Sequence, residues 1–232
     1  MKRILSLLLT LALMLTSLGL FGIENCAEKV DIVGNYPDVS ENAWYYAAVQ
    51  FCAEEKIITG YKDGRFGPGD AIQRQDFVVI LARVADVNLN GYNVNTVISK
   101  FSDVNDKNAY YLKALAWGYS KGIVNGYENG KFGVGDPVTR EQICVFVYRY
   151  LEKGGSSMVV PSTYVTDLLK FRDGGTVSQF AKNAVAWCVN KKVINGTKDN
   201  YLNPTKRALR CEVAQIFKNS YDKHLFNGWM DV

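Results

Sequence analysis

Three arginines occupy equivalent positions in three similar stretches of the sequence: Arg74, Arg140 and Arg210. In "TREQICVFVYRYL", which runs from Thr139 to Leu151, the arginine falls in the first turn of an expected helix. A cation there costs on the order of 0.3–1 kcal/mol, whereas the backbone N–H groups of a helix start favour an anion. A guanidinium beside such groups can bind a carboxylate or phosphate through paired hydrogen bonds. The repeated cation therefore indicates an anion site, unless an acidic residue of the chain neutralises it.

Three aspartates upstream of these positions are the candidates for internal neutralisation: Asp38, Asp103 and Asp173. Each precedes an expected helix by a few residues and could instead cap or orient the start of that helix. The spacing supports an external anion and an internal carboxylate equally, so both interpretations stay open at this point.

The arginines belong to an internal repeat that covers most of the chain. The three units span residues 36–87, 101–153 and 171–222, and we call them units one, two and three. In each unit a glycine ends a similar segment, "KIITG", "GIVNG" or "KVING", fourteen residues before the arginine. These glycines are Gly60, Gly126 and Gly196. The matched spacing indicates a repeat architecture, in which neighbouring units bury each other's apolar faces.

Each unit predicts a helix, a loop and a second helix. The first helix is expected over residues 43–56, 109–122 and 179–192. Small and aromatic residues recur at matched positions of this helix, as a packed face requires. They are Ala48, Ala114 and Ala184, and Phe51, Trp117 and Trp187. The glycine of each "I-x-G" segment suits a left-handed residue that ends the helix.

The second helix carries an apolar stripe at helical spacing. In unit two the stripe is Ile143, Phe146, Val147, Tyr150 and Leu151. Thr139 with Gln142 matches a capping box that fixes the helix start. The other stripes are Phe77, Ile80, Leu81, Val84 and Ala85, and Val213, Ile216, Phe217, Ser220 and Tyr221. One stripe cannot bury itself alone, so we expect a mainly all-α fold in which three stripes form a central bundle.

The loop between the helices, "YKDGRFGPGD" in unit one, has the composition of a turn. A calcium loop is the alternative, but the required ladder of oxygen ligands with a closing glutamate is absent, so we predict a plain turn and no metal. The aromatic residues Phe66, Phe132 and Tyr201 are expected to anchor these loops in the core. Connectors at 88–100 and 153–170 join the units, the second with a brief helical end.

Composition argues against several classes of function. The 232 residues carry a formal net charge of +4 with no basic run, so we expect no nucleic-acid partner. The only histidine, His224, lies in the tail at 223–232, which leaves no ready Ser-His-Asp or Cys-His site. Scattered Asp and Glu leave glycoside hydrolysis open, but an active site needs one asymmetric cluster rather than a threefold repeat. We therefore predict a protein that is not an enzyme and that uses no cofactor.

The N-terminus has the pattern of an export signal. Residues 1–27 combine a positive start with an apolar run from Ile4 to Leu15, which is short for a membrane span, although an uncleaved anchor helix is the alternative. No second long apolar stretch follows, so no membrane association is expected after cleavage. Besides Cys26, four cysteines lie in helical apolar patterns and predict buried thiols rather than a disulfide framework: Cys52, Cys144, Cys188 and Cys211.

Taken together, the motifs resemble the S-layer homology family. The units share an F-x-D-V-like start, a "GIVNGYENGKF"-like segment and a helix start like the T-R-A-E signature of that family. The signature reads Thr139-Arg140-Glu141-Gln142 in unit two, and its arginine alone recurs in all three units. The other two versions are Gln73-Arg74-Gln75-Asp76 and Leu209-Arg210-Cys211-Glu212.

The resemblance implies a pseudo-threefold bundle whose grooves bind a secondary cell wall polysaccharide that is linked to peptidoglycan and often pyruvylated. The three arginines would meet the ketal carboxylate, the glycines Gly60, Gly126 and Gly196 would let the backbone approach the sugar, and Tyr61 and Tyr127 would stack on it. Asp38, Asp103 and Asp173 are weaker candidates for sugar hydroxyls or groove structure. Unit three has Thr197 in place of the tyrosine, so we expect its groove to be the weakest or purely structural.

The function expected on these grounds is that of a non-catalytic module, exported to the bacterial cell wall, that anchors a protein at the cell surface through an anionic polysaccharide. The alternative is a surface scaffold that binds a partner protein or assembles with itself, with its arginines neutralised internally.

Overall fold

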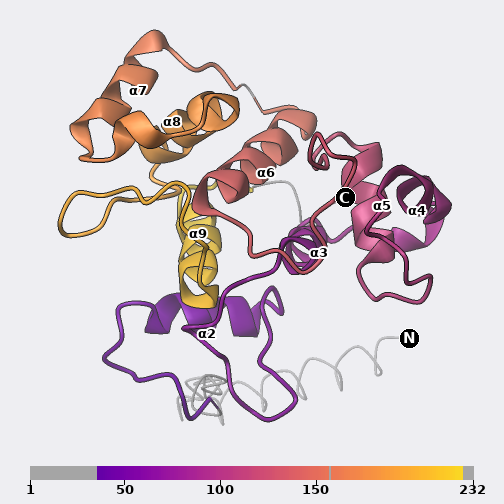
Figure 1. Ribbon diagram of the computed structural model, residues 1–232. Helices are drawn as coiled ribbons and strands as arrows, with labels where there is room; N and C mark the ends of the chain where they lie inside the picture. The colour runs from indigo at the N-terminus through magenta and orange to yellow at the C-terminus, as the bar shows by residue number, and fades with distance from the viewer. Residues whose placement is uncertain (1–35, 157, 227–232) are drawn as a thin grey trace, which may run out of the picture. The chain divides into compact units, whose positions relative to one another are not determined.

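The structure is a computed structural model that describes residues 36–156 and 158–226 (Figure 1). Contacts divide the chain after Asp31, and everything described below belongs to the second unit of that division, Ile32–Val232. The predicted export signal at 1–27 and the last residues of the tail, 227–232, lie outside the described residues.

The described residues are helical and contain no β-strand, which confirms the mainly all-α prediction. The first helices of the three repeat units are α2 (Tyr46–Glu54), α5 (Leu112–Ser120) and α8 (Lys182–Asn190). The second helices are α3 (Arg74–Val84), α6 (Arg140–Lys153) and α9 (Arg210–Asp222). Each second helix begins at its arginine, and the capping box of Thr139 and Gln142 is present in α6.

Both connectors contain short helices. The first holds the 3-10 helix η2 (Leu89–Gly91) and α4 (Asn95–Lys100), and the second holds α7 (Ser162–Asp167) and η3 (Leu168–Lys170). In unit three, the 3-10 helices η4 (Gly174–Thr176) and η5 (Gln179–Ala181) precede α8.

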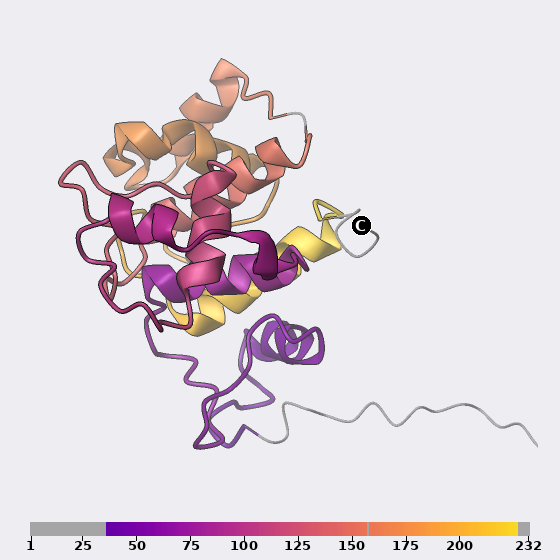
Figure 2. The same cartoon turned by 90° about the vertical axis from the view of Figure 1, so that its right-hand side faces the viewer.

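The helices pair between repeat units rather than within them. The second helix of each unit packs against the first helix of the next, so α3 contacts α5 and α6 contacts α8. The last pair closes the cycle, because α9 of unit three packs against α2 of unit one. Figures 1 and 2 both show the yellow α9 beside the indigo α2. A unit therefore contributes one helix to each of two neighbouring pairs.

The predicted apolar stripes form the centre of the core. Phe77 of α3 stacks on Phe146 of α6 and on Phe217 of α9, with ring centroids 5.8 and 5.9 Å apart. Burying each such side chain contributes roughly 1.5–3 kcal/mol. The stripe prediction is wrong at Tyr221, which is 46% exposed at the edge of α9 and packs on Phe51 instead.

A closed cycle of backbone hydrogen bonds joins the three units just before the second helices. The N–H of Ile72 donates to the carbonyl of Ala208, that of Ala208 to Val138, and that of Val138 back to Ile72, at 3.0, 2.9 and 2.9 Å. These residues lie two positions before the three arginines. The cycle sets the three helix starts side by side and supports the pseudo-threefold arrangement, which stays a prediction.

The residues that end the first helices are not the predicted glycines. Lys56, Gly122 and Lys192 take the left-handed conformation, with φ of 55°, 67° and 59°. Each sits in a Schellman arrangement; the next amide, for example that of Ile57, donates back to the carbonyl of Cys52. The glycine of the "I-x-G" segment comes a few residues later and serves a different purpose, described below.

The loops after the first helices are turns anchored by one buried side chain. Phe66 and Phe132 are fully buried, as predicted. The prediction for Tyr201 is wrong, since it is 37% exposed while Leu202 is buried. Leu202 lies six residues after its glycine, the same distance as the two phenylalanines, so position rather than aromatic character identifies the anchor.

The four cysteines of the described residues are free and buried, as predicted: Cys52, Cys144, Cys188 and Cys211. Burial raises the pKa of the Cys211 thiol to about 11 and that of Cys52 further still. The Cys52 and Cys211 thiols therefore stay protonated, and all four cysteines act as small packing residues.

Candidate functional site

The three arginines cross from one unit into the next. Arg74, Arg140 and Arg210 are only 3%, 8% and 9% exposed. Each Nε donates to the carbonyl of the buried loop residue of the following unit, at 2.7–3.0 Å. The acceptors are Phe132, Leu202 and Phe66 respectively. The arginine of unit three thus reaches unit one, in the same cyclic order as the helix pairs.

A second bond from each guanidinium reaches the residue just before the glycine of the "I-x-G" segment. Nη2 donates to the carbonyls of Asn125, Asn195 and Thr59, at 3.3, 3.2 and 2.8 Å. Each guanidinium therefore bridges two carbonyls of a neighbouring loop. We name the three places by the units they join: the one–two junction at Arg74, the two–three junction at Arg140 and the three–one junction at Arg210.

The helix-start amides are occupied rather than open to a ligand. The N–H groups of Arg74, Arg140 and Arg210 donate to backbone carbonyls of the adjoining unit at 2.9–3.0 Å. The next amides of α6 and α9, on Glu141 and Cys211, do the same. The expectation of free amides is wrong at these positions. Carbonyl oxygens of the neighbouring loop supply the negative partial charge that lets a cation sit at a helix start.

The three aspartates hold their own loops. The Asp38 carboxylate accepts from the amides of Phe66 and Gly67 at 2.9 and 2.7 Å. Asp103 and Asp173 accept in the same way from the matching loops of units two and three. Burial acts to raise the pKa of Asp103, but the three loop amides outweigh burial and hold that pKa below its usual value.

Two expectations for these aspartates are therefore wrong. None of them caps a first helix, because the residues before α2, α5 and α8 make no side-chain capping bond. Among the described residues, none of them forms an ion pair with the three arginines. Their carboxylates accept two or three backbone amides each and hold the loop, and their predicted contact with sugar hydroxyls stays a prediction.

The three glycines make room for an aromatic ring. A Cβ on Gly60 would lie 2.2 Å from the Tyr36 ring and 2.8 Å from the Arg65 carbonyl oxygen. A Cβ on Gly126 or Gly196 would lie 2.5 Å from the ring of Phe101 or Phe171. These glycines are required by packing inside their own unit. Their predicted contact with a sugar stays a prediction.

The two tyrosines lie over arginines. The Tyr127 ring lies 4.6 Å from the Arg74 guanidinium and the Tyr61 ring 4.5 Å from that of Arg210. Such cation–π contacts contribute on the order of 0.5–2 kcal/mol. The ring faces that were expected to stack on a sugar thus pack on the cation of the preceding unit.

The two–three junction is built differently. Thr197 replaces the tyrosine, and Arg140 has no ring partner among the described residues. Its Nη1 instead forms an ion pair with Glu212 of α9 at 3.2 Å. The residues at the matching places of units one and two, Asp76 and Gln142, make no such pair with Arg210 or Arg74.

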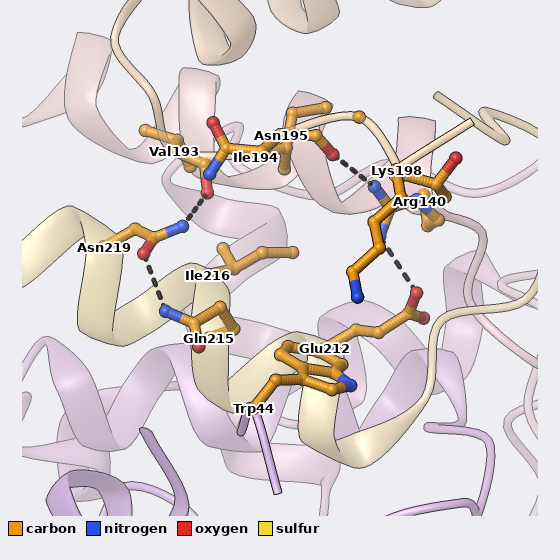
Figure 3. A pocket seen from close by; sticks show the side chains of 12 residues that line it. Trp44, Arg140, Val193, Ile194, Asn195, Lys198, Glu212, Gln215, Ile216 and Asn219 are labelled. Carbon is orange, nitrogen blue, oxygen red and sulfur yellow. Dashed lines mark hydrogen bonds and ion pairs between the residues drawn. The ribbon is translucent and has the colours of Figure 1, made fainter. Parts of the chain in front are cut away.

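A pocket of about 460 Å³ opens at this junction (Figure 3). All three units contribute to its wall: Trp44 comes from unit one, Arg140 from unit two and the rest from unit three. The lining residues are Trp44, Arg140, Val193, Ile194, Asn195, Gly196, Thr197, Lys198, Glu212, Gln215, Ile216 and Asn219. Of the predicted site residues, the pocket therefore brings together Arg140 and Gly196.

The sequence analysis missed a set of exposed aromatic residues. Trp44, Tyr110 and Phe180 are 64%, 69% and 63% exposed. Each lies four residues before the matched alanine of its first helix, so the repeat alignment contained the signal. Tyr110 of unit two reaches the three–one junction, where its hydroxyl donates to the Asp76 carboxylate. Trp44 of unit one thus lies at the two–three junction, and Tyr110 of unit two lies at the three–one junction. At both junctions the aromatic residue comes from the unit that does not form the junction.

Comparison with known proteins agrees with this repeat structure. The model of the S-layer homology domain matches residues 35–78, 100–144 and 170–214, together more than half of the chain. The chain is 26% identical to an endoglucanase of Bacillus sp. (strain KSM-635) over 215 residues, which cover 93% of the chain and 22% of that protein.

Two further relatives carry names that refer to the cell surface. The cellulosome-anchoring protein of Acetivibrio thermocellus is 26% identical over 74% of the chain and 37% of that protein. The surface-layer 125 kDa protein of Lysinibacillus sphaericus is 27% identical over 75% of the chain and 14% of that protein. The chain thus spans well under half the length of these relatives.

Among the described helices, none has both the length and the apolar composition needed to cross a membrane.

With three tandem matches placed on its three repeat units, the chain belongs to the S-layer homology domain family, whose domains are cell-surface anchoring modules.

Proposed function

We propose that the chain anchors a protein to the bacterial cell wall by binding an anionic, pyruvylated secondary cell wall polysaccharide at the unit junctions. Binding requires no chemistry on the sugar, so the module acts without catalysis and without a cofactor. Arg74, Arg140 and Arg210 contribute the positive charge of the three junctions, and Gly60, Gly126 and Gly196 shape the adjoining loops.

The observation that carries this proposal is the pocket at the two–three junction. Its volume of about 460 Å³ lies within the range of small-ligand sites, roughly 300–1,000 Å³. It combines an arginine at a helix start, a glycine of the "I-x-G" segment and amide side chains that suit sugar hydroxyls. At the other two junctions, Nη1 of Arg74 and of Arg210 has no hydrogen-bond partner within the described residues.

Sedimentation with purified wall sacculi tests the proposal. The protein should sediment with sacculi that carry the polysaccharide and stay in solution with acid-stripped sacculi. Arg74→Lys combined with Arg210→Lys should weaken sedimentation, because lysine keeps the charge but cannot bridge two carbonyls and also offer a ligand the free N–H groups of Nη1. Circular dichroism of the variant must show intact helices; equal sedimentation of a folded variant would remove the arginines from the mechanism.

A second candidate function is a scaffold that binds a partner protein or assembles with itself. It is favoured by the internal bonding of all three guanidinium groups to backbone carbonyls. On this hypothesis soluble polysaccharide fragments leave the melting temperature unchanged. On the anchoring proposal they raise it, since a ligand that binds only the folded state stabilises it.

A further inference from the structure

We propose that Lys198, not Arg140, reads the acidic group of the sugar in the two–three pocket, and that Trp44 of unit one is the surface on which the sugar ring stacks. This inference rests on the proposed function and assigns roles within it to two residues outside the signature motif.

Every nitrogen of the Arg140 guanidinium already donates one hydrogen bond within the protein. Its Nε donates to Leu202, its Nη2 to Asn195 and its Nη1 to the Glu212 carboxylate, at 2.9, 3.2 and 3.2 Å. Glu212 also neutralises its charge within the pocket wall. A ligand carboxylate would therefore have to displace an internal acid that is already bound, and the Arg140–Glu212 pair offers it little net attraction.

Lys198 is the remaining cation of the pocket lining. It is exposed and makes no hydrogen bond or ion pair with any described residue. Figure 3 shows its side chain extending across the front of Arg140 toward the side of the pocket that holds Glu212 and Trp44. With Arg140 and Glu212 cancelling, Lys198 leaves the lining with one positive charge, which suits a ligand with one carboxylate.

Trp44 supplies an aromatic wall that unit three itself lacks. Its ring lines the pocket, although 64% of the residue is exposed, and it is held edge-on against Tyr45 with centroids 5.3 Å apart. A flat ring of this size can cover the apolar C–H face of a pyranose at little entropic cost. Thr197 also lines the pocket, at the position where the other two junctions have a tyrosine over the arginine.

Amide groups complete the pocket floor. Gln215 donates through Nε2 to Asn219 at 2.8 Å, and Asn219 donates to the carbonyl of Val193 at 3.1 Å. This chain fixes both amides, and the side-chain carbonyl of Gln215 makes no hydrogen bond to a described residue. It is therefore available to accept from a sugar hydroxyl or an acetamido N–H.

Binding of two defined probes tests the inference: the methyl glycoside of an N-acetylhexosamine that carries a pyruvyl ketal, and the same glycoside without the pyruvyl group. Lys198→Gln should weaken binding of the pyruvylated probe about tenfold and leave binding of the neutral probe unchanged. The matched control is Lys62→Gln, at the same position of unit one, which should change either affinity less than about twofold.

Tryptophan fluorescence provides a second readout. Trp117 and Trp187 are buried, whereas Trp44 is exposed, so ligand stacked on Trp44 should shift the emission to shorter wavelength. Trp44→Leu should abolish the shift and weaken binding of both probes about equally, while Phe180→Leu, at the equivalent position of unit three, should not.

The outcomes separate the inference from the proposed function. If the wild-type protein sediments with sacculi but Lys198→Gln and Trp44→Leu behave like their controls, the inference is wrong and the anchoring proposal stands. Failure of the wild-type protein to bind either probe while it still sediments also overturns the inference. Absence of sedimentation overturns both.

Discussion

The one–two and three–one junctions differ from the two–three junction in what covers the arginine. At the first two, a tyrosine ring lies 4.6 and 4.5 Å from the guanidinium of Arg74 and Arg210. At the third, Thr197 stands in place of the ring, Glu212 pairs with Arg140, and a pocket is open. The same backbone bridge can thus support either a covered arginine or a cavity.

This difference separates two roles of the repeated arginine. The bonds from Nε and Nη2 to neighbouring carbonyls are the same at all three junctions and therefore belong to assembly of the fold. What varies is the group beside the guanidinium, a tyrosine ring or the Glu212 carboxylate, and we propose that this group decides whether a ligand finds room. Unit three, expected from its sequence to be the weakest site, lines the pocket, and its binding remains a prediction.

Replacing the arginines by alanine should have the largest effect. Arg74→Ala and Arg210→Ala should each lower the free energy of unfolding by about 3 kcal/mol, because two carbonyls lose a charged donor. Arg140→Ala should cost more, since Glu212 is left without its partner. Urea unfolding followed by circular dichroism measures this. Arg65→Ala, at an exposed residue, is the control; a cost below about 1 kcal/mol for all three arginines would contradict the structural role.

Adding a methyl group to the three glycines should distinguish the units. Gly60→Ala and Gly126→Ala should each cost about 2–3 kcal/mol, because the Cβ meets both a ring and a backbone oxygen closer than 3.0 Å. Gly196→Ala should cost about 1 kcal/mol, since its nearest backbone oxygen is 3.4 Å away and only the Phe171 ring must move. Equal costs in thermal unfolding would show that the loop of unit three is packed as tightly as the others.

Exchanging the covering residue should convert one kind of junction into the other. Tyr127→Thr should cost about 1 kcal/mol through loss of the contact with Arg74. Thr197→Tyr should place a ring over Arg140 and occupy the pocket, which lowers binding of the soluble polysaccharide without unfolding the protein. Calorimetric titration checks binding. Undiminished binding by Thr197→Tyr would show that the pocket is not where the ligand sits.

Loss of the Tyr110 hydroxyl proton at high pH should give the smallest and most local effect. Burial, and then the hydrogen bond to Asp76, raise its pKa from 10.0 to about 12. Because the folded-state pKa lies above the unfolded one, the stabilisation from this hydroxyl is complete below about pH 10 and is lost as the pH rises through about 12. Ultraviolet titration of tyrosinate should show that Tyr110→Phe removes one of the late-ionising groups of the protein. Asp76→Asn should shift it to lower pH; no shift would exclude the Asp76 contact as a cause.

Sequence periodicity predicted the helices well because a buried face leaves a pattern of residue types. The stripes of α3, α6 and α9 were correct except at Tyr221, which the end of α9 carries to the surface. Periodicity does not say which helix covers which face, so the pairing of α9 with α2 across the cycle was not predicted.

The site was less predictable because its main acceptors are backbone carbonyls, which have no sequence signature. Asp38 and Arg210 both bind the backbone of Phe66, yet the aspartate accepts from its amide and the arginine donates to its carbonyl. The exposed Trp44 lies outside the apolar face, so helical periodicity does not identify it. Its sequence signal is the match with Tyr110 and Phe180, four residues before the alanine of each unit.

The pairing of helices between units rather than within them has a consequence for how the protein can assemble. Because α9 is the main partner of α2 among the described helices, no single unit can be removed without leaving an apolar helix face uncovered on each side of the gap. A molecule that opens at one junction can regain every lost contact by accepting the matching unit of a second molecule. Dimers formed by such swapping would need no surface beyond the one that already holds the monomer together.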